Sequence, residues 1–246
     1  MSNGEQQAAE HVVTWFGLLH IPVHLPGLSE HEALIVAFTW ASMAIVIGVT
    51  ASVALGMRTV PRGLQNILEL IVGFLEGFIT DIIGPKGLTY FPLIITAFSF
   101  ILVSNYLGLV PGCLPPTGNL NTTLAWALVV FFFYQYLGFS KHGFKYLKHF
   151  MGPVPVLAPF MFVIEIISEF ARPLSLSVRL FANILAGEII IGKILMPIAL
   201  AILPLFWVPV FWMMWESVIT APIQAFIFSL MTMIYIGGAV AAGDHS

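Results

Sequence analysis

Long uncharged stretches of hydrophobic residues dominate the chain, and their lengths suit helices that cross a lipid bilayer. Residues 33–57 form a first such run, without a single Asp, Glu, Lys, Arg or His. A helix of roughly 20 apolar residues spans the hydrocarbon core of a bilayer, so this run predicts a transmembrane helix. The next run, 87–140, is too long for one span, and a Pro- and Gly-rich turn signal at 111–119 divides it. We therefore expect two further spans, at 89–111 and 121–139.

The C-terminal part of the chain predicts two longer spans. Uncharged runs cover 194–215, which three prolines punctuate, and 217–243. With the apolar residues before them, they indicate spans at 155–202 and 206–240. The runs are continuously apolar rather than alternating, which argues against a membrane β-barrel. The expected fold is an all-α polytopic membrane protein with five transmembrane helices, the last two long and tilted, in a single membrane domain over 1–246.

The segment 60–85 differs from the spans because polar residues recur in it at helical spacing. Gln65, Glu69 and Glu76 alternate with hydrophobic residues at the period of a helix. This pattern is typical of an amphipathic helix that lies in the membrane interface.

Basic residues between the first four spans occur on one set of loops only. Residues 1–57 and the turn at 111–120 contain no Lys or Arg. The basic residues of the other loops are Arg58, Arg62, Lys86, Lys141, Lys145 and Lys148. Lys and Arg concentrate in cytoplasmic loops, so the N-terminal segment 1–32 is expected outside and the amphipathic helix at the cytoplasmic face.

Composition agrees with a membrane protein and excludes several classes. Of the 246 residues, 59% are hydrophobic and only 9% are charged, against roughly 25% charged in soluble domains. The net charge of −3 offers no basic surface for nucleic acid. The only cysteine, Cys113, excludes an intrachain disulfide and a cysteine-based zinc cluster.

The outer N-terminal segment contains four histidines: His11, His20, His24 and His31. Pro22 lies between two of them and disfavours a helical pair of metal ligands, so we expect solvated histidines and no metal site. The segment also lacks the basic start of a cleavable signal peptide.

A cluster of polar residues at 165–188 interrupts strongly apolar sequence. Arg179 lies about 24 residues beyond the prolines at 153–155, a helical rise of roughly 36 Å. In a strongly tilted helix this places Arg179 deep in the membrane. An intramembrane arginine costs about 3 kcal/mol, so such a residue marks a functional site.

Helical geometry assigns these side chains to two faces. At about 100° per residue, Arg172, Arg179 and Asn183 fall on one face, whereas Glu188 points to the other. Glu165 joins the arginine face if the helix continues through Pro173. Within this helix Arg179 has no carboxylate partner. It pairs either with another acid of this chain, for which Glu216 is the candidate, or with a carboxylate of a different chain.

The last span contains two further polar residues, Glu216 and Gln224. Gln224 is suited to a hydrogen bond between helices. Glu216 lies next to Trp212 and Trp215, in what resembles an aromatic belt at the outer interface, so it is either a functional acid or an interfacial anchor.

Several motifs together resemble subunit a of F-type ATP synthases. The most specific is the segment 175–188, SLSVRLFANILAGE. Supporting segments are 104–112 (SNYLGLVPG), 119–123 (NLNTT), 165–174 (EIISEFARPL) and 224–228 (QAFIF), in family order. The resemblance covers about residues 60–240, and its length is similar to bacterial and plastid members; the N-terminal part favours the bacterial inner membrane.

The resemblance implies a non-catalytic stator subunit of the Fo proton channel beside a rotating ring of c subunits. Two offset half-channels would serve the ring carboxylates, so that ion flow drives rotation and ATP synthesis. Partners would be the c ring, the b-subunit peripheral stalk, the remaining ATP synthase subunits and membrane lipid. No cofactor, metal or nucleic acid is implied. The N-terminus would lie outside and the C-terminus in the cytoplasm.

Site residues carry over position by position. Arg179 matches the family's essential arginine, which faces the ring and acts as a barrier. Asn183 matches the polar residue one turn on, and Glu188 the acid of the outer half-channel. Gln224 matches the last-helix glutamine near the arginine, and Glu165 a carboxyl near the inner half-channel.

Two positions depart from the family pattern. Many relatives carry an ionisable residue seven positions before the last-helix glutamine; here that residue is Ser217, and Glu216 is eight before. Pro222 lies between and allows a one-residue bulge that would restore Glu216 to the proton path. Some relatives also have an acid at the position of Gly108, so Asn105 is left to line the outer channel there.

Two other function classes are weighed against this one. A secondary ion-coupled transporter is expected to have internal repeats, which five spans do not supply. An intramembrane enzyme needs a nucleophile or metal motif, and the chain has neither HExxH nor GxSxG. A stator subunit should co-purify with a small proteolipid ring, whereas a transporter should move its substrate alone in liposomes.

Overall fold

The computed structural model describes residues 29–110, 112–143, 146, 158–201 and 207–241. The described part is helical, contains no β-strand, and includes five helical rods long and apolar enough to cross a membrane. The prediction of an all-α polytopic membrane protein with five spans is confirmed.

The first three spans are single helices. They are α3 (Glu30–Leu55), α5 (Phe91–Leu107) and α6 (Leu120–His142). A short 3-10 helix, η1 (Pro85–Tyr90), leads into α5, and another, η2 (Pro116–Gly118), precedes α6. The Asn119 side chain caps α6 by accepting a 2.8 Å hydrogen bond from the Asn121 N–H.

The last two spans are composite and longer. Helix α8 (Ala158–Ile189) continues through a π-helical segment, η5 (Ile190–Leu195), into α9 (Met196–Ala201). Helix α10 (Trp207–Trp215) continues through a second π-helical segment, η7 (Glu216–Thr220), into α11 (Ala221–Ala241).

Each π-helical segment ends two residues before a proline, and the proline explains it. The Pro222 ring would clash with the carbonyl of Val218 in a regular α-helix. In the wider π turn, the Ala221 N–H bonds instead to the Glu216 carbonyl, five residues back. The Met196 N–H likewise bonds to the Ile191 carbonyl just before Pro197. The one-residue bulge predicted next to Pro222 is therefore present.

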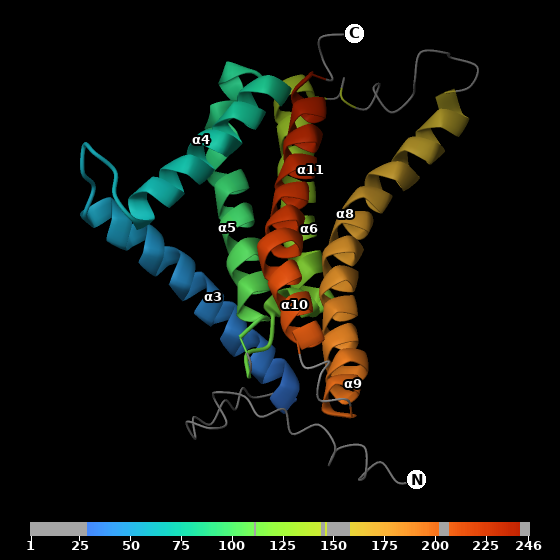
Figure 1. Ribbon diagram of the computed structural model, residues 1–246. Helices are drawn as coiled ribbons and strands as arrows, with labels where there is room; N and C mark the ends of the chain where they lie inside the picture. Colours follow the sequence, from blue (N-terminus) through green and yellow to red (C-terminus); the bar gives the residue numbers. More distant parts are fainter. Residues whose placement is uncertain (1–28, 111, 144–145, 147–157, 202–206, 242–246) are drawn as a thin grey trace.

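Helices α5, α6 and α11 lie side by side at the centre, and α8 crosses them on one flank (Figure 1). Buried side chains such as Ile101, Val130, Leu180 and Phe228 form the core between them. Helix α3 starts at one end of the molecule and α11 finishes at the other, as five crossings require (Figure 1).

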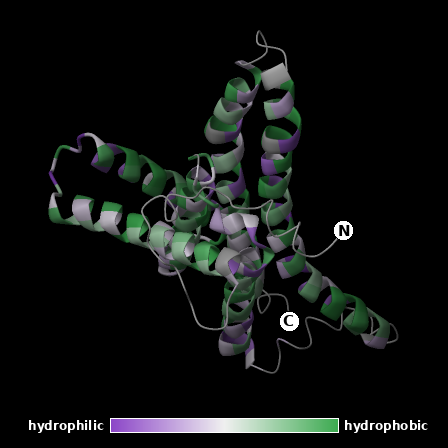
Figure 2. Cartoon of the chain, turned by 90° about the horizontal axis from the view of Figure 1, so that it is seen from below, coloured by the Kyte–Doolittle hydropathy of each residue, from purple (hydrophilic) through white to green (hydrophobic). Residues whose placement is uncertain are grey.

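Helix α4 (Leu64–Ile82) is the amphipathic helix expected within 60–85, and it is not among the candidate spans. It buries Leu75 and Ile79 against the core, while Leu70 and Phe74 are exposed. It meets α3 at a turn on the flank opposite α8 (Figure 1). The sequence of α3 is hydrophobic along most of its length, as a lipid-facing helix should be. Seen from below, hydrophobic residues cover most of the helical rods (Figure 2).

Candidate functional site

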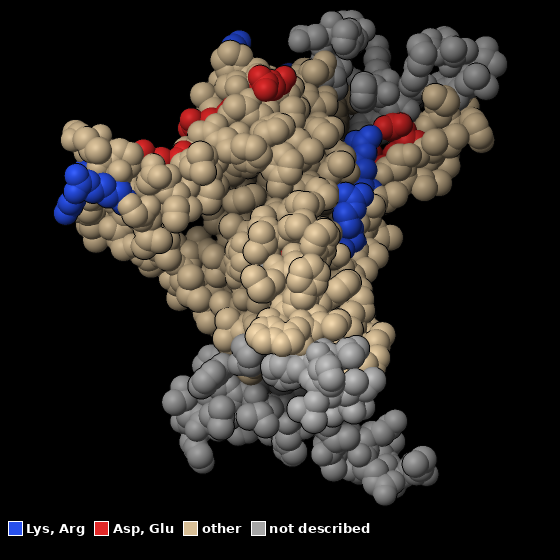
Figure 3. All heavy atoms as spheres, viewed as in Figure 1, with Lys and Arg blue, Asp and Glu red and all other residues tan. Residues whose placement is uncertain are grey.

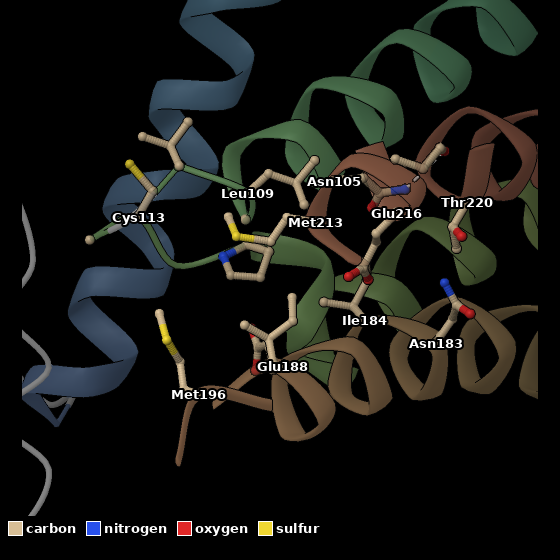
Figure 4. A pocket seen from close by; sticks show the side chains of 16 residues that line it. Asn105, Leu109, Cys113, Asn183, Ile184, Glu188, Met196, Met213, Glu216 and Thr220 are labelled. Atoms are coloured by element: carbon tan, nitrogen blue, oxygen red, sulfur yellow. Dashed lines mark hydrogen bonds between the residues drawn. The ribbon is translucent and has the colours of Figure 1, made fainter. Parts of the chain in front are cut away.

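A cavity of about 470 Å³ opens between α5, the turn that follows it, the C-terminal part of α8, and the junction of α10 with α11. It brings together four residues predicted separately along 112 residues of sequence: Asn105, Asn183, Glu188 and Glu216 (Figure 4). The two carboxyl groups that line this open space can exchange protons with water inside it, and the asparagine amides can form hydrogen bonds there.

Asn105 forms part of the cavity wall and is buried. Its amide nitrogen donates to the Ala221 carbonyl at 3.3 Å, and its amide oxygen accepts a 2.8 Å hydrogen bond from the Thr117 hydroxyl. The side chain therefore ties α5 to the start of α11 (Figure 4) and, through Thr117, to η2. In this arrangement Asn105 positions the wall through hydrogen bonds to protein groups on both sides.

Glu216 is the first residue of the π-helical segment η7, and its carboxyl group packs directly on the backbone of Gly187 in α8. A Cβ atom at position 187 would overlap the Glu216 carboxyl oxygens. The glycine before Glu188 thus lets a carboxylate from the last span approach α8 where any other residue would block it.

Glu188 and Asn183 reach the cavity from α8. A Cβ at Gly118 would lie 3.4 Å from the Glu188 Oε1, so the η2 turn borders that carboxyl group. The Asn183 amide nitrogen is buried and has no hydrogen-bond partner among the described residues. An amide hydrogen left free at the edge of a polar cavity can bond to water that enters it.

Arg179 lies outside this cavity, on an exposed face of α8. Within the described parts of the chain it forms no ion pair with a carboxylate, so the pair with Glu216 that the sequence left open is not formed. By helical rise it lies about 14 Å along α8 from Glu188. Figure 3 shows basic side chains exposed over α8 beside α11.

A second polar cluster lies on the other side of Arg179 along α8. Arg172 pairs with the Glu165 carboxylate at 3.4 Å and with Glu169, and its guanidinium lies 5.5 Å from the centre of the Tyr235 ring in α11. Glu165 was expected to share a face with the arginines only if the helix continued through Pro173. Helix α8 does continue through Pro173, so Glu165 lies on that face.

Glu169 is the buried centre of that cluster, and sequence reasoning gave it no role. Its carboxylate accepts hydrogen bonds from the Tyr134 hydroxyl at 2.8 Å and the Gln135 amide at 2.9 Å, both in α6. It is 6% exposed, and Arg172 compensates its charge. The i,i+3 spacing of Glu169 and Arg172 was the signal that could have predicted this pair.

Tyr146, just beyond α6, packs against Gly138, where a Cβ would clash with its ring. Burial, together with the nearby Glu169 carboxylate, raises the pKa of Tyr146 to about 12. The phenol therefore stays neutral at physiological pH and adds no charge to the cluster.

The family model for the ATP synthase A chain matches residues 36–237. The chain belongs to the ATP synthase subunit a family. It is 44% identical over 229 residues to ATP synthase subunit a of Geotalea uraniireducens, with 93% of this chain and 96% of the relative covered. It is 45% identical to subunit a of Geobacter sulfurreducens, covering 92% and 94%, and 46% identical to subunit a 2 of Syntrophotalea carbinolica, covering 87% of each.

Membership of this family confirms the resemblance drawn from the sequence motifs. With bacterial relatives and five candidate spans, the chain is a multi-pass protein of the bacterial inner membrane. The matches offer no support for a secondary transporter or an intramembrane enzyme.

Two predicted features remain apart from the cavity. Gln224 is half-buried on α11 and does not line the cavity. Of the histidines, His11, His20 and His24 lie outside the described residues, and the side chain of His31 is not described. Among the residues that are described, no group of His, Cys, Asp or Glu could hold a metal ion.

Proposed function

We propose that the chain is the non-catalytic stator subunit of the Fo proton channel. In this proposal it serves the carboxylates of a c-subunit ring through two offset half-channels separated by Arg179. It assembles with the c ring, the b-subunit peripheral stalk and the remaining ATP synthase subunits, with its N-terminus outside and its C-terminus in the cytoplasm.

The observation that carries the proposal is the state of Arg179. It is exposed on the flank of a candidate span and has no carboxylate partner in the described chain. A guanidinium is permanently charged, and an unpaired charge in lipid is costly. A carboxylate of a neighbouring ring would pair with the guanidinium and lower this free-energy cost, and the described chain supplies no such carboxylate.

The cavity at Glu188 and Glu216 fits the outer half-channel. Glu188 would pass protons towards the ring, with Asn183 hydrogen-bonding water on the same path. Glu216 would take the place of the ionisable residue that many relatives have one position later. Asn105 would hold the wall of this path. The Arg172 cluster, with Glu165 exposed by about a third, would border the inner half-channel, and Gln224 would face the ring near Arg179.

Desolvation explains how such a layout drives rotation. A ring carboxylate can face lipid only when it is protonated, because burying its charge is expensive. At the inner half-channel it releases its proton to water, and the anion is stabilised beside Arg179. It regains a proton from the outer half-channel before it re-enters lipid. Each proton that crosses the membrane contributes about 2.3 kcal/mol per 100 mV, and ATP hydrolysis would pump protons the other way.

The test is coupled ATP synthesis in membrane vesicles that contain the assembled enzyme with Arg179→Ala. We expect synthesis driven by a proton gradient to fall to background, because the ring anion loses its counter-ion. Lys86→Gln, which removes an exposed basic residue far from the cavity, should leave synthesis unchanged. An Arg179→Ala enzyme that makes ATP at the wild-type rate would refute the proposal.

A further inference from the structure

A crevice runs between α3 and α4, on the flank of the molecule away from α8, and its character changes along its length. Its deeper part is an apolar cavity of about 170 Å³ lined by residues of α3, α4 and α5, among them Val49, Ile71 and Phe98. Its outer part, at the turn between the two helices, is a cavity of about 270 Å³ whose lining includes Arg58 and Arg62. The two cavities follow one another along the same pair of helices.

The two arginines are exposed, and neither forms an ion pair with a carboxylate of the described chain. Figure 3 shows basic side chains together at the tip where α3 and α4 meet. Acidic side chains of α4 begin beyond this tip; the nearest in sequence is Glu69, whose carboxylate accepts a hydrogen bond from the Gln65 amide at 2.8 Å. Among the described residues, no carboxylate compensates the positive charge of this tip.

Gln65 fixes the arginine-bearing turn in place. Its side chain is buried, its amide oxygen accepts from the Arg58 N–H at 3.1 Å, and its amide nitrogen donates to the Arg58 carbonyl at 2.9 Å. The turn then enters α4 through Gly63, whose φ of 59° suits glycine. No side chain caps the N-terminus of α4, so its free N–H groups add to the positive potential there.

We propose that this crevice binds one anionic phospholipid. Arg58 and Arg62 bind the phosphate of the headgroup at the membrane surface, and the apolar cavity between α3, α4 and α5 takes an acyl chain. A phospholipid fits both parts because its charged headgroup and its acyl chain follow one another in the same order as the arginines and the apolar cavity of the crevice. A free phosphate would use the arginines alone and leave the apolar cavity without a role.

The test is native mass spectrometry of the full-length chain, purified in detergent and titrated with phosphatidylglycerol or phosphatidylcholine. We expect Arg58→Gln/Arg62→Gln to weaken phosphatidylglycerol binding about 25-fold, which corresponds to about 2 kcal/mol for two basic residues at the membrane surface. Lys86→Gln is the matched control, because it removes one basic residue of the same set of loops outside the crevice. It should bind phosphatidylglycerol as the wild type does.

The apolar half of the site needs its own variant. Val49→Trp fills the deeper cavity and should displace the lipid without any change of charge, whereas Val163→Trp on the exposed face of α8 should not. Binding of inorganic phosphate alone would not respond to Val49→Trp, so this variant distinguishes a lipid from a free phosphate. Equal phosphatidylglycerol binding by the wild type and the double arginine variant, or unchanged binding by Val49→Trp, would each overturn the proposal.

Discussion

At position 187, the absence of a side chain decides where the carboxyl group of Glu216 lies. That carboxyl occupies the space a Cβ would fill, so α8 and the last span approach each other through a glycine and an acid. The contact joins residues 29 apart in sequence across two spans. It follows that a substitution at Gly187 moves the acid without removing it.

We predict that Gly187→Ala reduces proton pumping, because the methyl group displaces the Glu216 carboxyl from α8. A displacement on the order of 1 Å can cost up to about 100-fold in rate, so a loss of between about 3- and 100-fold is expected. ATP-driven acidification of inverted vesicles measures it. Glu216→Gln should produce a loss at least as large, and Gly73→Ala on α4, where a Cβ meets no atom within 4 Å, should have no effect. Normal pumping by both Gly187→Ala and Glu216→Gln would remove Glu216 from the pathway.

Cys113 reports on the side from which the cavity opens. It lines the cavity from the turn between α5 and α6, it is half-buried, and burial raises the pKa of its thiol. Since the thiolate is the reactive form, a membrane-impermeant maleimide should label Cys113 slowly at neutral pH and faster as the pH rises. The labelling rate of Cys113 should still increase with pH in a range where the labelling rate of an exposed cysteine no longer changes.

The matched control is Leu120→Cys in a Cys113→Ser background, an exposed position at the start of α6 on the same side. Mass spectrometry of the labelled chain gives both rates. Both thiols should be labelled in spheroplasts rather than in inverted vesicles. Labelling of Cys113 only in inverted vesicles would contradict the outer assignment of the cavity.

From the sequence it was possible to select residues that line the cavity, but not to predict all of their contacts. Motif and helical spacing selected Asn183 and Glu188, and both line the cavity although they point in different directions around α8. The hydrogen bond between Thr117 and Asn105 joins a turn to a buried helix, and no local pattern signals such a pairing. Polar contacts between spans depend on how the helices pack, which the hydrophobic pattern leaves open.

At the level of elements, the departure from the family pattern at Glu216 coincides with a change in helix geometry. The π-helical segment η7 begins at this residue. The proline at 222 disfavours a regular turn before it, and the extra residue per turn shifts Glu216 relative to the residues of α11. Sequence alone suggested a bulge here. The similar segment η5, before Pro197, was not anticipated, because three prolines in that region leave the position of a distortion undetermined.

We predict that the bulge and the acid form a matched pair. Moving the acid with Glu216→Ser/Ser217→Glu should reduce proton pumping, since the π turn then carries the carboxyl about 100° away from its present direction. Adding Pro222→Ala permits a regular α-helix and should recover pumping in that double variant. Pro222→Ala alone should be impaired.

Pumping by these three variants, measured in the same vesicles, decides the question. Recovery in the triple variant supports a role for the π turn in aiming Glu216. A triple variant no better than the double variant, alongside an unimpaired Pro222→Ala, would show that the bulge has no such role.

At the level of the whole molecule, α8 places Arg179, which has no carboxylate partner among the described residues, between two polar regions. Towards one end lies the Arg172 cluster with Glu165 and Glu169, and towards the other lies the cavity with Glu188. Along the helix, Arg179 lies about 10 Å from Arg172 and about 14 Å from Glu188. This order along a single span is the one that the proposed barrier between two half-channels would require.

The span count and helical class of this architecture followed directly from the uncharged runs, because bilayer thickness restricts where such runs can go. The splayed arrangement of α3 and α4 could not be predicted from these uncharged runs. Their packing depends on side-chain contacts such as the bonds between Gln65 and the Arg58 backbone, which hydrophobicity does not encode.

The most direct test of the central claim is passive proton conductance through the membrane sector with Arg179→Ala, after the soluble catalytic part has been stripped and with the ring held by a cross-link to this chain. With rotation blocked, wild-type vesicles should conduct almost no protons, because the guanidinium separates the two half-channels. The Arg179→Ala vesicles should leak, and an inhibitor that modifies the ring carboxylates should stop the leak. Equally tight membranes for both proteins would contradict the account.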